Sequence, residues 1–253
     1  MPSPRIPLIL TAAIALALPR AALGQGSPPL NTNDPALVGR GNLELNFGFA
    51  HTRSAGGRDT ELPILDANYG FSDKAQLSYV VSWLTARPAG GGRQSGLSNS
   101  TLGVKWRFLD GGEKGPSASL HPQLEFNNPG SRAKSRGLVD DGATLTIPFQ
   151  WQRSFGDWTV TADVGRAFHF KRADDWHGGV SAGRPVGSTL TLGVELFAEA
   201  AKHLDRSALL LSFAGTVKVA EKSALLIALG RELHRHDGDR ATFVGYLGWQ
   251  VQR

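Results

Sequence analysis

The sequence contains no cysteine. A disulfide framework, a thiolate nucleophile and a cysteine metal site are therefore all excluded. Charge is sparse as well: Asp, Glu, Lys and Arg make up 19% of the 253 residues, and the formal net charge is +5. That charge is mild for the length, and no run rich in Lys or Arg accompanies it, so no nucleic-acid partner is expected. With 41% hydrophobic residues, the chain resembles neither a disordered protein nor a helical membrane protein.

Long apolar runs are missing after the first 24 residues. The run at 6–18, IPLILTAAIALAL, has 13 residues, which is too short to cross a bilayer as a helix. Arg5 precedes it, and the small residues Ala22 and Gly24 follow at positions suited to cleavage. This layout predicts a secretory signal peptide over residues 1–24 rather than an uncleaved anchor.

What the chain has instead is alternation. In NLELNFGFAH (42–51), Leu43, Leu45, Phe47 and Phe49 alternate with polar or small residues, which is the pattern of a strand with one apolar face. Twelve such runs follow one another, separated by turn residues. They span roughly 42–51, 60–70, 74–85, 99–109, 117–127, 141–153, 156–170, 175–185, 188–200, 207–219, 222–234 and 240–252.

The apolar faces meet either the core of a soluble sandwich or lipid. Most runs reach the roughly 9–11 residues of a tilted membrane strand, whereas soluble strands usually have about 5–6. Short turns alternate with longer polar connections, as in outer-membrane barrels. We therefore predict an all-β fold: a transmembrane antiparallel up-and-down β-barrel of about 12 strands over residues 42–253, after an irregular leader at 25–41, QGSPPLNTNDPALVGRG.

Aromatic residues support this prediction, because they gather near both ends of the runs, where rings settle at the lipid headgroups. Tyr79 and Phe213 are the mid-run exceptions. The group near the short turns comprises Tyr69, Trp106, Phe108, Trp151, Trp158 and Trp249, and the group near the long connections comprises Phe49, Trp83, Phe126, Phe168, Phe170, Trp176 and Phe243.

Charged residues on the opposite faces are predicted to line the lumen. With Glu232 included they comprise seven acids and three bases, so we expect a weak preference for cations if a pore exists. Twelve strands lie between the sizes that leave an open channel and a filled interior, and salt-bridged side chains that fill the lumen remain the alternative. The lumen-facing set is Glu44, Asp66, Lys105, Arg107, Glu125, Asp163, Glu195, Glu199 and Lys218.

Three stretches resemble a known family: GNLELNFGFAHT, ELPILDANYGFSDKAQLSYVVSWL and SGLSNSTLGVKWRFLD. They are similar to the N-terminal half of predicted outer-membrane barrels named for the phenol meta-cleavage degradation pathway. The resemblance covers about residues 41–130, and Ser98 and Asn99 replace the small-acidic pair usual after Gly-Leu. It implies an outer-membrane location and a role as a transporter of hydrophobic or aromatic compounds, and it brings no catalytic residues or cofactor.

Three other groups of residues carry weaker hypotheses. Arg132, Lys134 and Arg136 offer a contact for lipopolysaccharide phosphates, although a solvated loop is the simpler interpretation. His234, His236 and Asp237 have the residue types of a metal site but no clear third ligand after the two histidines. Ser119 and His121 share a strand face at roughly 6–7 Å, which is too far apart for a nucleophile and its base.

The leading hypothesis is thus a passive outer-membrane channel for small molecules, with hydrophobic or aromatic compounds as candidate solutes. Two alternatives stay open: a closed structural or lipopolysaccharide-contacting barrel, and a barrel lipid hydrolase. The expected partners are outer-membrane lipid, lipopolysaccharide, a small solute and the barrel-assembly machinery. Sequence does not decide whether the lumen is open or whether the loops at 86–98 and 128–140 plug it.

Overall fold

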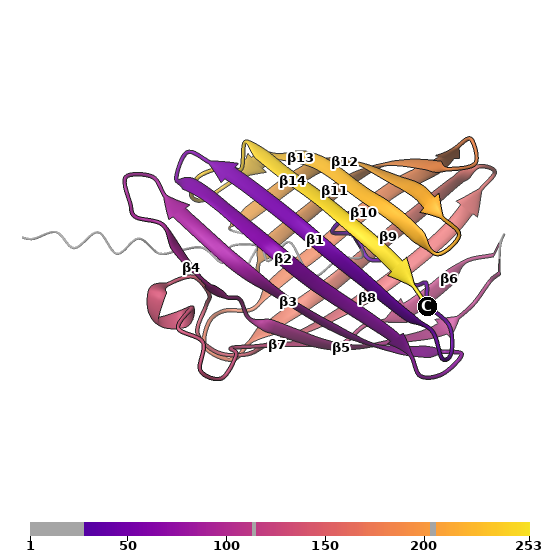
Figure 1. Cartoon of the computed structure of the whole chain (residues 1–253), viewed down its shortest axis with the longest axis horizontal. Coiled ribbons are helices and arrows are strands. Elements are labelled where there is room, and N and C mark those ends of the chain that lie inside the picture. The colour runs from indigo at the N-terminus through magenta and orange to yellow at the C-terminus, as the bar shows by residue number, and fades with distance from the viewer. Residues whose placement is uncertain (1–27, 113–114, 203–205) are drawn as a thin grey trace, which may run out of the picture.

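A computed structural model describes residues 28–112, 115–202 and 206–253. The predicted signal peptide lies outside these residues. The described strands form one antiparallel sheet that closes on itself, because β1 pairs with β14 as well as with β2 (Figure 1). The strands are β1 (Leu43–Ser54), β2 (Gly57–Gly70), β3 (Ala75–Pro88), β4 (Gln94–Leu97), β5 (Ser100–Leu109), β6 (Ser117–Leu120), β7 (Gln123–Phe126), β8 (Thr144–Phe155), β9 (Trp158–His169), β10 (Asp175–Val186), β11 (Leu190–Ala201), β12 (Ser207–Ala220), β13 (Ser223–Arg235) and β14 (Phe243–Gln252).

Two membrane strands are each divided in two, so these segments form the twelve predicted membrane strands. Strand β3 pairs with both β4 and β5, and β8 pairs with both β6 and β7. The second break falls at Pro122, which has no backbone N–H to donate. The wall stays closed there, because Val104 N donates to Pro122 O over 3.0 Å and His121 N donates to Pro148 O over 3.1 Å.

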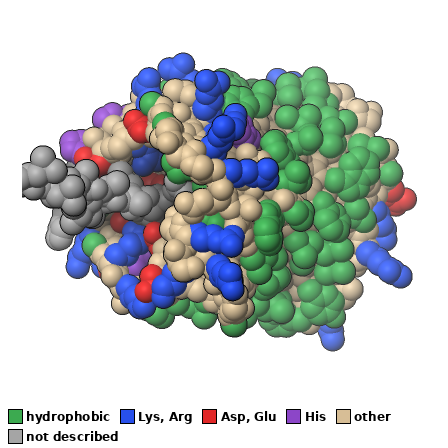
Figure 2. Space-filling view, turned by 60° about the vertical axis from the view of Figure 1, so that its left-hand side comes forward, with side chains coloured by type: hydrophobic (Ala, Val, Ile, Leu, Met, Phe, Trp, Pro, Cys, Tyr) green, Lys and Arg blue, Asp and Glu red, His purple; other side chains and the backbone are tan. Residues whose placement is uncertain are grey.

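The alternation sorts side chains between lipid and lumen. Phe47 is 49% exposed on the outer wall, whereas its neighbour Asn46 is fully buried inside. Gln150 and Glu195 are also fully buried, and the buried apolar residues are mostly alanines. An interior that is polar, with large apolar residues outside, is the inverse of a soluble core. Figure 2 shows the outer residues as a hydrophobic band around the wall. The prediction that Leu43, Leu45, Phe47 and Phe49 belong to a barrel's outer face is confirmed.

Aromatic rings on the outer wall follow the predicted belts. Tyr69, Trp106, Trp158 and Trp249 are exposed near one end, which also carries the start of β1 and the end of β14. Trp83, Trp176 and Phe243 are exposed near the other end. The first end is periplasmic, because both ends of the barrel lie on the short-turn side in such proteins.

The outer loops differ from the prediction. The segment expected as a longer connection after β1 is a tight turn, because β1 and β2 continue past the apolar band as far as Ser54 and Gly57. Most of the segment 86–98 is also strand, since β3 and β4 form an extended hairpin. Neither of these elements enters the lumen.

The loop after β7 does turn inward. It contains the 3₁₀ helix η1 (Lys134–Arg136). Ala133 and Leu138 pack against Leu84 and Ala86, which are inward-facing residues of β3. The loop therefore covers one side of the outer mouth. No helix in the described ranges is long and apolar enough to span a bilayer.

Candidate functional site

The leader enters the barrel with the residues that the structure describes, 28 onward. Its described part, residues 28–41, contains no strand or helix, and Thr32 and Asn33 are about 95% buried. Thr32 N donates to Glu195 Oε1 over 2.5 Å, and Asn33 N donates to Asp163 Oδ2 over 3.0 Å. A buried backbone N–H group needs a hydrogen-bond acceptor. The leader has no secondary structure to supply one, and carboxylates of the lumen wall accept these hydrogen bonds instead.

A second set of contacts holds the leader nearer the periplasm. Lys105 Nζ donates to Asp34 O over 2.9 Å, and the same ammonium group lies 3.9 Å from the Asp34 carboxylate. Val38 N donates to Gln76 Oε1 over 3.0 Å. The leader is thus held by individual side chains from β3, β5, β9 and β11, and it adds no strand to the sheet.

The wall is shaped to accept the leader at Gly179 of β10. A Cβ atom built on this glycine would lie 2.2 Å from Thr32 Oγ1 and 2.9 Å from Phe197 Cδ2. Both distances are far below a van der Waals contact, so an alanine here would push the leader away. Gly179 therefore lets the chain approach the wall closely.

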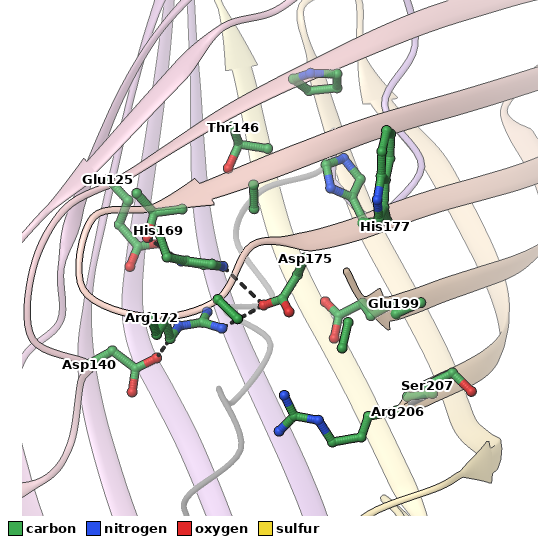
Figure 3. A pocket seen from close by; sticks show the side chains of 18 of the residues that line it. Glu125, Asp140, Thr146, His169, Arg172, Asp175, His177, Glu199, Arg206 and Ser207 are labelled. Atoms are coloured by element: carbon green, nitrogen blue, oxygen red, sulfur yellow. Dashed lines mark hydrogen bonds and ion pairs between the residues drawn. The ribbon is translucent and has the colours of Figure 1, made fainter. Parts of the chain in front are cut away.

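Above the leader, the lumen contains a cavity of about 370 Å³ that opens toward the outer mouth. Its floor includes Asn31 and Asn33, and its lower wall includes the stacked rings of His177 and Phe197, 6.1 Å apart at 24°. Ionisable residues surround the upper part (Figure 3). They include Glu125, Asp140, His169, Arg172, Asp175, Glu199, Arg206 and Arg235.

Several of these charges neutralise one another. Asp175 Oδ2 lies 3.0 Å from His169 Nε2 and 2.5 Å from Arg172 Nη1. Arg172 Nε lies 3.5 Å from Asp140 Oδ2. Glu199 has no ion pair or hydrogen bond within the described residues, and its carboxylate borders the cavity beside the aromatic rings. The cavity therefore offers a flat apolar surface next to a carboxylate.

Below the leader lies a second cavity of about 200 Å³. It is lined by Glu44, Asp66, Gln76 and Lys105, together with leader residues such as Asp34. Asn33 borders both cavities. The two spaces are thus the upper and lower parts of one polar lumen, and the leader stands between them.

Ion pairs connect the loops at the outer mouth. Asp141 Oδ1 lies 2.6 Å from Lys134 Nζ, and Asp141 Oδ2 lies 2.7 Å from Lys171 Nζ. These two ammonium groups hold the pKa of the Asp141 carboxyl below its ordinary range. The ion pairs connect the inward loop to the loop after β9.

Most of the predicted lumen residues border these spaces. Glu125 and Glu199 line the upper cavity, and Glu44, Asp66 and Lys105 line the lower one. Asp163 and Glu195 hold the leader. The other two, Arg107 and Lys218, neither line a cavity nor hydrogen-bond to the described leader: Arg107 pairs with Asp110 at 2.8 Å, and Lys218 is exposed at the periplasmic end of β12.

Sequence reasoning missed other side chains that point inward. Glu61 accepts a hydrogen bond from Ser82 Oγ inside the barrel, and Arg235 donates hydrogen bonds to Glu232. Each lies next to a register shift, one in β2 after Glu61 and one between Leu209 and Leu210 of β12. An extra residue reverses which side chains point inward. Pro63 lies within the shift of β2 and is a residue that strands tolerate at bulges, so it could have signalled this position, whereas nothing comparable stands beside Arg235.

The remaining candidates do not form reactive sites. His121 Nε2 contacts Ser78 Oγ at 3.0 Å, while His121 Nδ1 faces the amide nitrogen of Gln123 at 3.0 Å. An amide N–H can only donate, so Nδ1 accepts and Nε2 carries the proton. This imidazole thus lacks the free Nε2 needed to activate the Ser78 hydroxyl. Ser119 donates to Gln150 instead of contacting His121.

The residues proposed as metal ligands, His234, His236 and Asp237, do not form a metal site either. His234 is exposed on the outer face of β13, in register with Leu209. Within the described residues, no group of three His, Asp or Glu side chains is arranged to hold a metal ion. Of the loop bases, Lys134 is paired with Asp141, and Arg136 Nη1 donates to Ser95 O over 2.6 Å.

Solved structures with this fold are outer-membrane barrels. A crystal structure of an outer membrane channel from Pseudomonas putida F1 aligns with a TM-score of 0.68 at 15% identity, over 86% of this chain and 97% of that one. The NanC porin aligns at 0.57 and 8% identity over 83% and 98%, and the KdgM porin at 0.54 and 11% over 81% and 98%. These likenesses support the fold. The closed sheet and its outer apolar band are those of an outer-membrane barrel.

No curated protein matches the sequence. A family model does match, over residues 27–247, which is most of the chain. The match includes the whole described leader and the barrel up to residue 247 in β14, and it agrees with the resemblance seen over about residues 41–130. The chain belongs to the family described as "Putative MetA-pathway of phenol degradation".

Proposed function

We propose that this barrel is a passive outer-membrane channel for small molecules, and that its own leader forms the constriction. The observation that carries the proposal is the divided lumen: two polar cavities meet at Asn33 and are separated by a leader without secondary structure. A segment held by a few side chains can move without disturbing the hydrogen bonds of the sheet. Passage requires that the leader move aside.

Small hydrophobic or aromatic compounds are the proposed solutes. The family description names phenol degradation, and the upper cavity pairs the Phe197 and His177 rings with the Glu199 carboxylate. A phenol-sized ring fits a cavity of 370 Å³ and can stack on an aromatic side chain. Its hydroxyl group can donate a hydrogen bond to Glu199.

Releasing the leader tests the channel. In the variant Asp163→Ala/Glu195→Ala, the N–H groups of Thr32 and Asn33 lose their acceptors. Hydrogen bonds to charged groups contribute about 1.5–3 kcal/mol each, so their loss is expected to raise the open fraction at least about tenfold. Single-channel conductance and liposome swelling with phenol-sized and larger solutes measure this rise.

Glu199→Ala provides the matched control. It removes an inward carboxylate from the same strand as Glu195, but among the described residues the leader hydrogen-bonds to Glu195 and not to Glu199. We expect it to leave conductance low and to weaken uptake of phenols. Cation preference is expected in all open forms, because acidic side chains outnumber basic ones in the lining of both cavities. Firm anion selectivity, or no conductance in the released variant, would contradict the proposal.

A closed structural barrel is the second candidate. The leader and the inward loop with Ala133 and Leu138 both occupy the lumen in this structure, which favours it. The same recordings separate the two functions. We do not propose an enzyme, because the Ser78–His121 pair, found in the lumen among the described residues, has the wrong protonated nitrogen and a glutamine where a carboxylate is needed.

A further inference from the structure

Three arginines lie side by side on the outer wall. Arg53 of β1 is paired in register with Arg58 of β2, and Arg58 is paired with Arg87 of β3. All three are exposed, and they belong to the outward set because the adjacent residues Asp59 and Ala86 belong to the inward one. Side chains paired directly across antiparallel strands have Cβ atoms about 4.5–5.5 Å apart. We call Arg53, Arg58 and Arg87 the arginine row.

No carboxylate of the described residues forms an ion pair with the arginine row. The adjacent acid Asp59 points to the other side of the sheet, and the Asp239 carboxylate lies against Gly56 in the turn. Like charges directly opposite one another destabilise a sheet. Three guanidinium groups in register therefore form a site at which an external anion would relieve repulsion.

The polarity of the outer wall decreases from the arginine row toward the middle of the membrane. The next outward layer consists of His51, Thr60, Thr85 and Ser95, which are paired in register and are all polar. It lies two residues, about 7 Å, further along the strands. Below it come large apolar residues, among them Leu62, Trp83 and Leu97, which are exposed. Figure 2 shows Lys and Arg side chains along this border of the hydrophobic band.

We propose that the arginine row binds a phosphate group of the lipopolysaccharide in the outer leaflet. Guanidinium forks bind phosphate oxygens in pairs. In this arrangement the phosphate lies at the arginine row, the sugar hydroxyls lie against the polar layer, and the acyl chains lie against the apolar band. The site lies at the outer end of the barrel, where this glycolipid is the phosphate-bearing lipid. The proposal that the arginine row binds this phosphate depends on the outer-membrane location, but it does not depend on solute passage through the barrel.

The test compares the variant Arg53→Gln/Arg58→Gln/Arg87→Gln with a control that loses three bases elsewhere. Arg40→Gln/Lys74→Gln/Lys222→Gln removes exposed bases from the periplasmic end. The barrel in detergent is melted with and without lipid A that carries both phosphates, and unfolding is followed by heat-modifiable gel migration. Lipid A is expected to raise the Tm of the wild type and the control by several degrees. It is expected to leave the Tm of the arginine-row variant unchanged.

Further arms identify the source of the phosphate. Lipid A without phosphates, phosphatidylglycerol and inorganic phosphate are each expected to give little stabilisation of the wild type. Equal stabilisation by phosphatidylglycerol would overturn the assignment to lipopolysaccharide, and equal stabilisation of the arginine-row variant by lipid A would overturn the site. If the triple variant does not fold, Arg58→Gln removes the central charge and is expected to lose most of the Tm shift. Conductance recorded on the same samples is expected to be unchanged, so this test and that of the channel fail independently.

Discussion

At the scale of single residues, Gly179 is the place where the wall of β10 leaves room for the leader, because a Cβ atom there would lie 2.2 Å from Thr32 Oγ1. Gly179 is in register with Asp163 on one side and with Phe197 on the other, and Glu195 lies two residues from Phe197 on the same strand. The Asp163 and Glu195 carboxylates and the glycine thus both help to hold the leader against the wall. The carboxylates bind the leader's N–H groups, and the glycine leaves room for Thr32.

Gly179→Ala is therefore expected to open the channel. The added methyl group would meet Thr32 Oγ1 at 2.2 Å, and such overpacking costs about 1–3 kcal/mol if nothing moves. The leader can move, whereas the sheet cannot, so single-channel recordings should show a higher open fraction. Gly193→Ala is the control, because its Cβ would meet its nearest neighbour at an ordinary 3.5 Å. Equal conductance of both variants would argue against contact between leader and wall.

The sequence predicted the charges of the lumen better than their partners. Alternation places Asp163 and Glu195 inside without any knowledge of contacts, because the strand period is two. It fails at Glu61 and Arg235, where a register shift reverses the pattern. It also gives no reason to pair these acids with residues 31–33, since hydrogen bonds to a backbone leave no trace in the sequence.

At the scale of elements, the strands were predictable and the loops were not. The apolar face of each membrane strand is fixed by lipid. Beyond the apolar band that constraint ends, and β1 and β2 continue through cross-strand pairs such as Arg53 with Arg58. Such pairing depends on the partner strand, so local sequence does not reveal where a hairpin stops. The inward loop likewise owes its position to Leu138 and Ala133 packing on β3.

The inward loop is expected to loosen in acid. The pKa of Asp141 is lowered from its ordinary 3.8 by Lys134 and Lys171, so its ion pairs stabilise the loop above that value. The contribution is lost as the pH falls through the lowered pKa. Hydrogen exchange, corrected for intrinsic rates, should show equal protection of the Leu138 amide at pH 7 and pH 5 and a loss of protection below about pH 3.

Asp141→Asn is expected to loosen the loop already at neutral pH, since the amide cannot attract both lysines. Asp140→Asn serves as the control, because Asp140 has a longer contact of 3.5 Å to Arg172. Trypsin at neutral pH reports the difference through cleavage after Lys134 and Arg136. If the Asp141 variant is cut no faster than the control, the ion pairs do not hold the loop.

At the scale of the whole molecule, the barrel and its leader are two parts with different bonding. The sheet closes through β1 and β14 and is held by backbone pairs throughout. The described leader is held mainly by side chains, at Gln76, Lys105, Asp163 and Glu195, and its last residue, Gly41, donates a backbone hydrogen bond to Gly70 O over 2.7 Å. The sequence predicted both segments, but not that the second lies inside the first, because a polar segment without periodicity carries no signal of its location.

A disulfide between leader and wall tests the central claim, that the leader closes a conducting lumen, most directly. The chain has no cysteine, and Thr32 Cβ lies 3.2 Å from the Cβ position of Gly179, near the spacing of a disulfide. In Thr32→Cys/Gly179→Cys, single-channel recordings should show no conductance when oxidised. Reductant should then open the channel, because the side chain added at position 179 repels the leader once the two sulfur atoms are unlinked. Conductance that is the same before and after reduction would contradict the account.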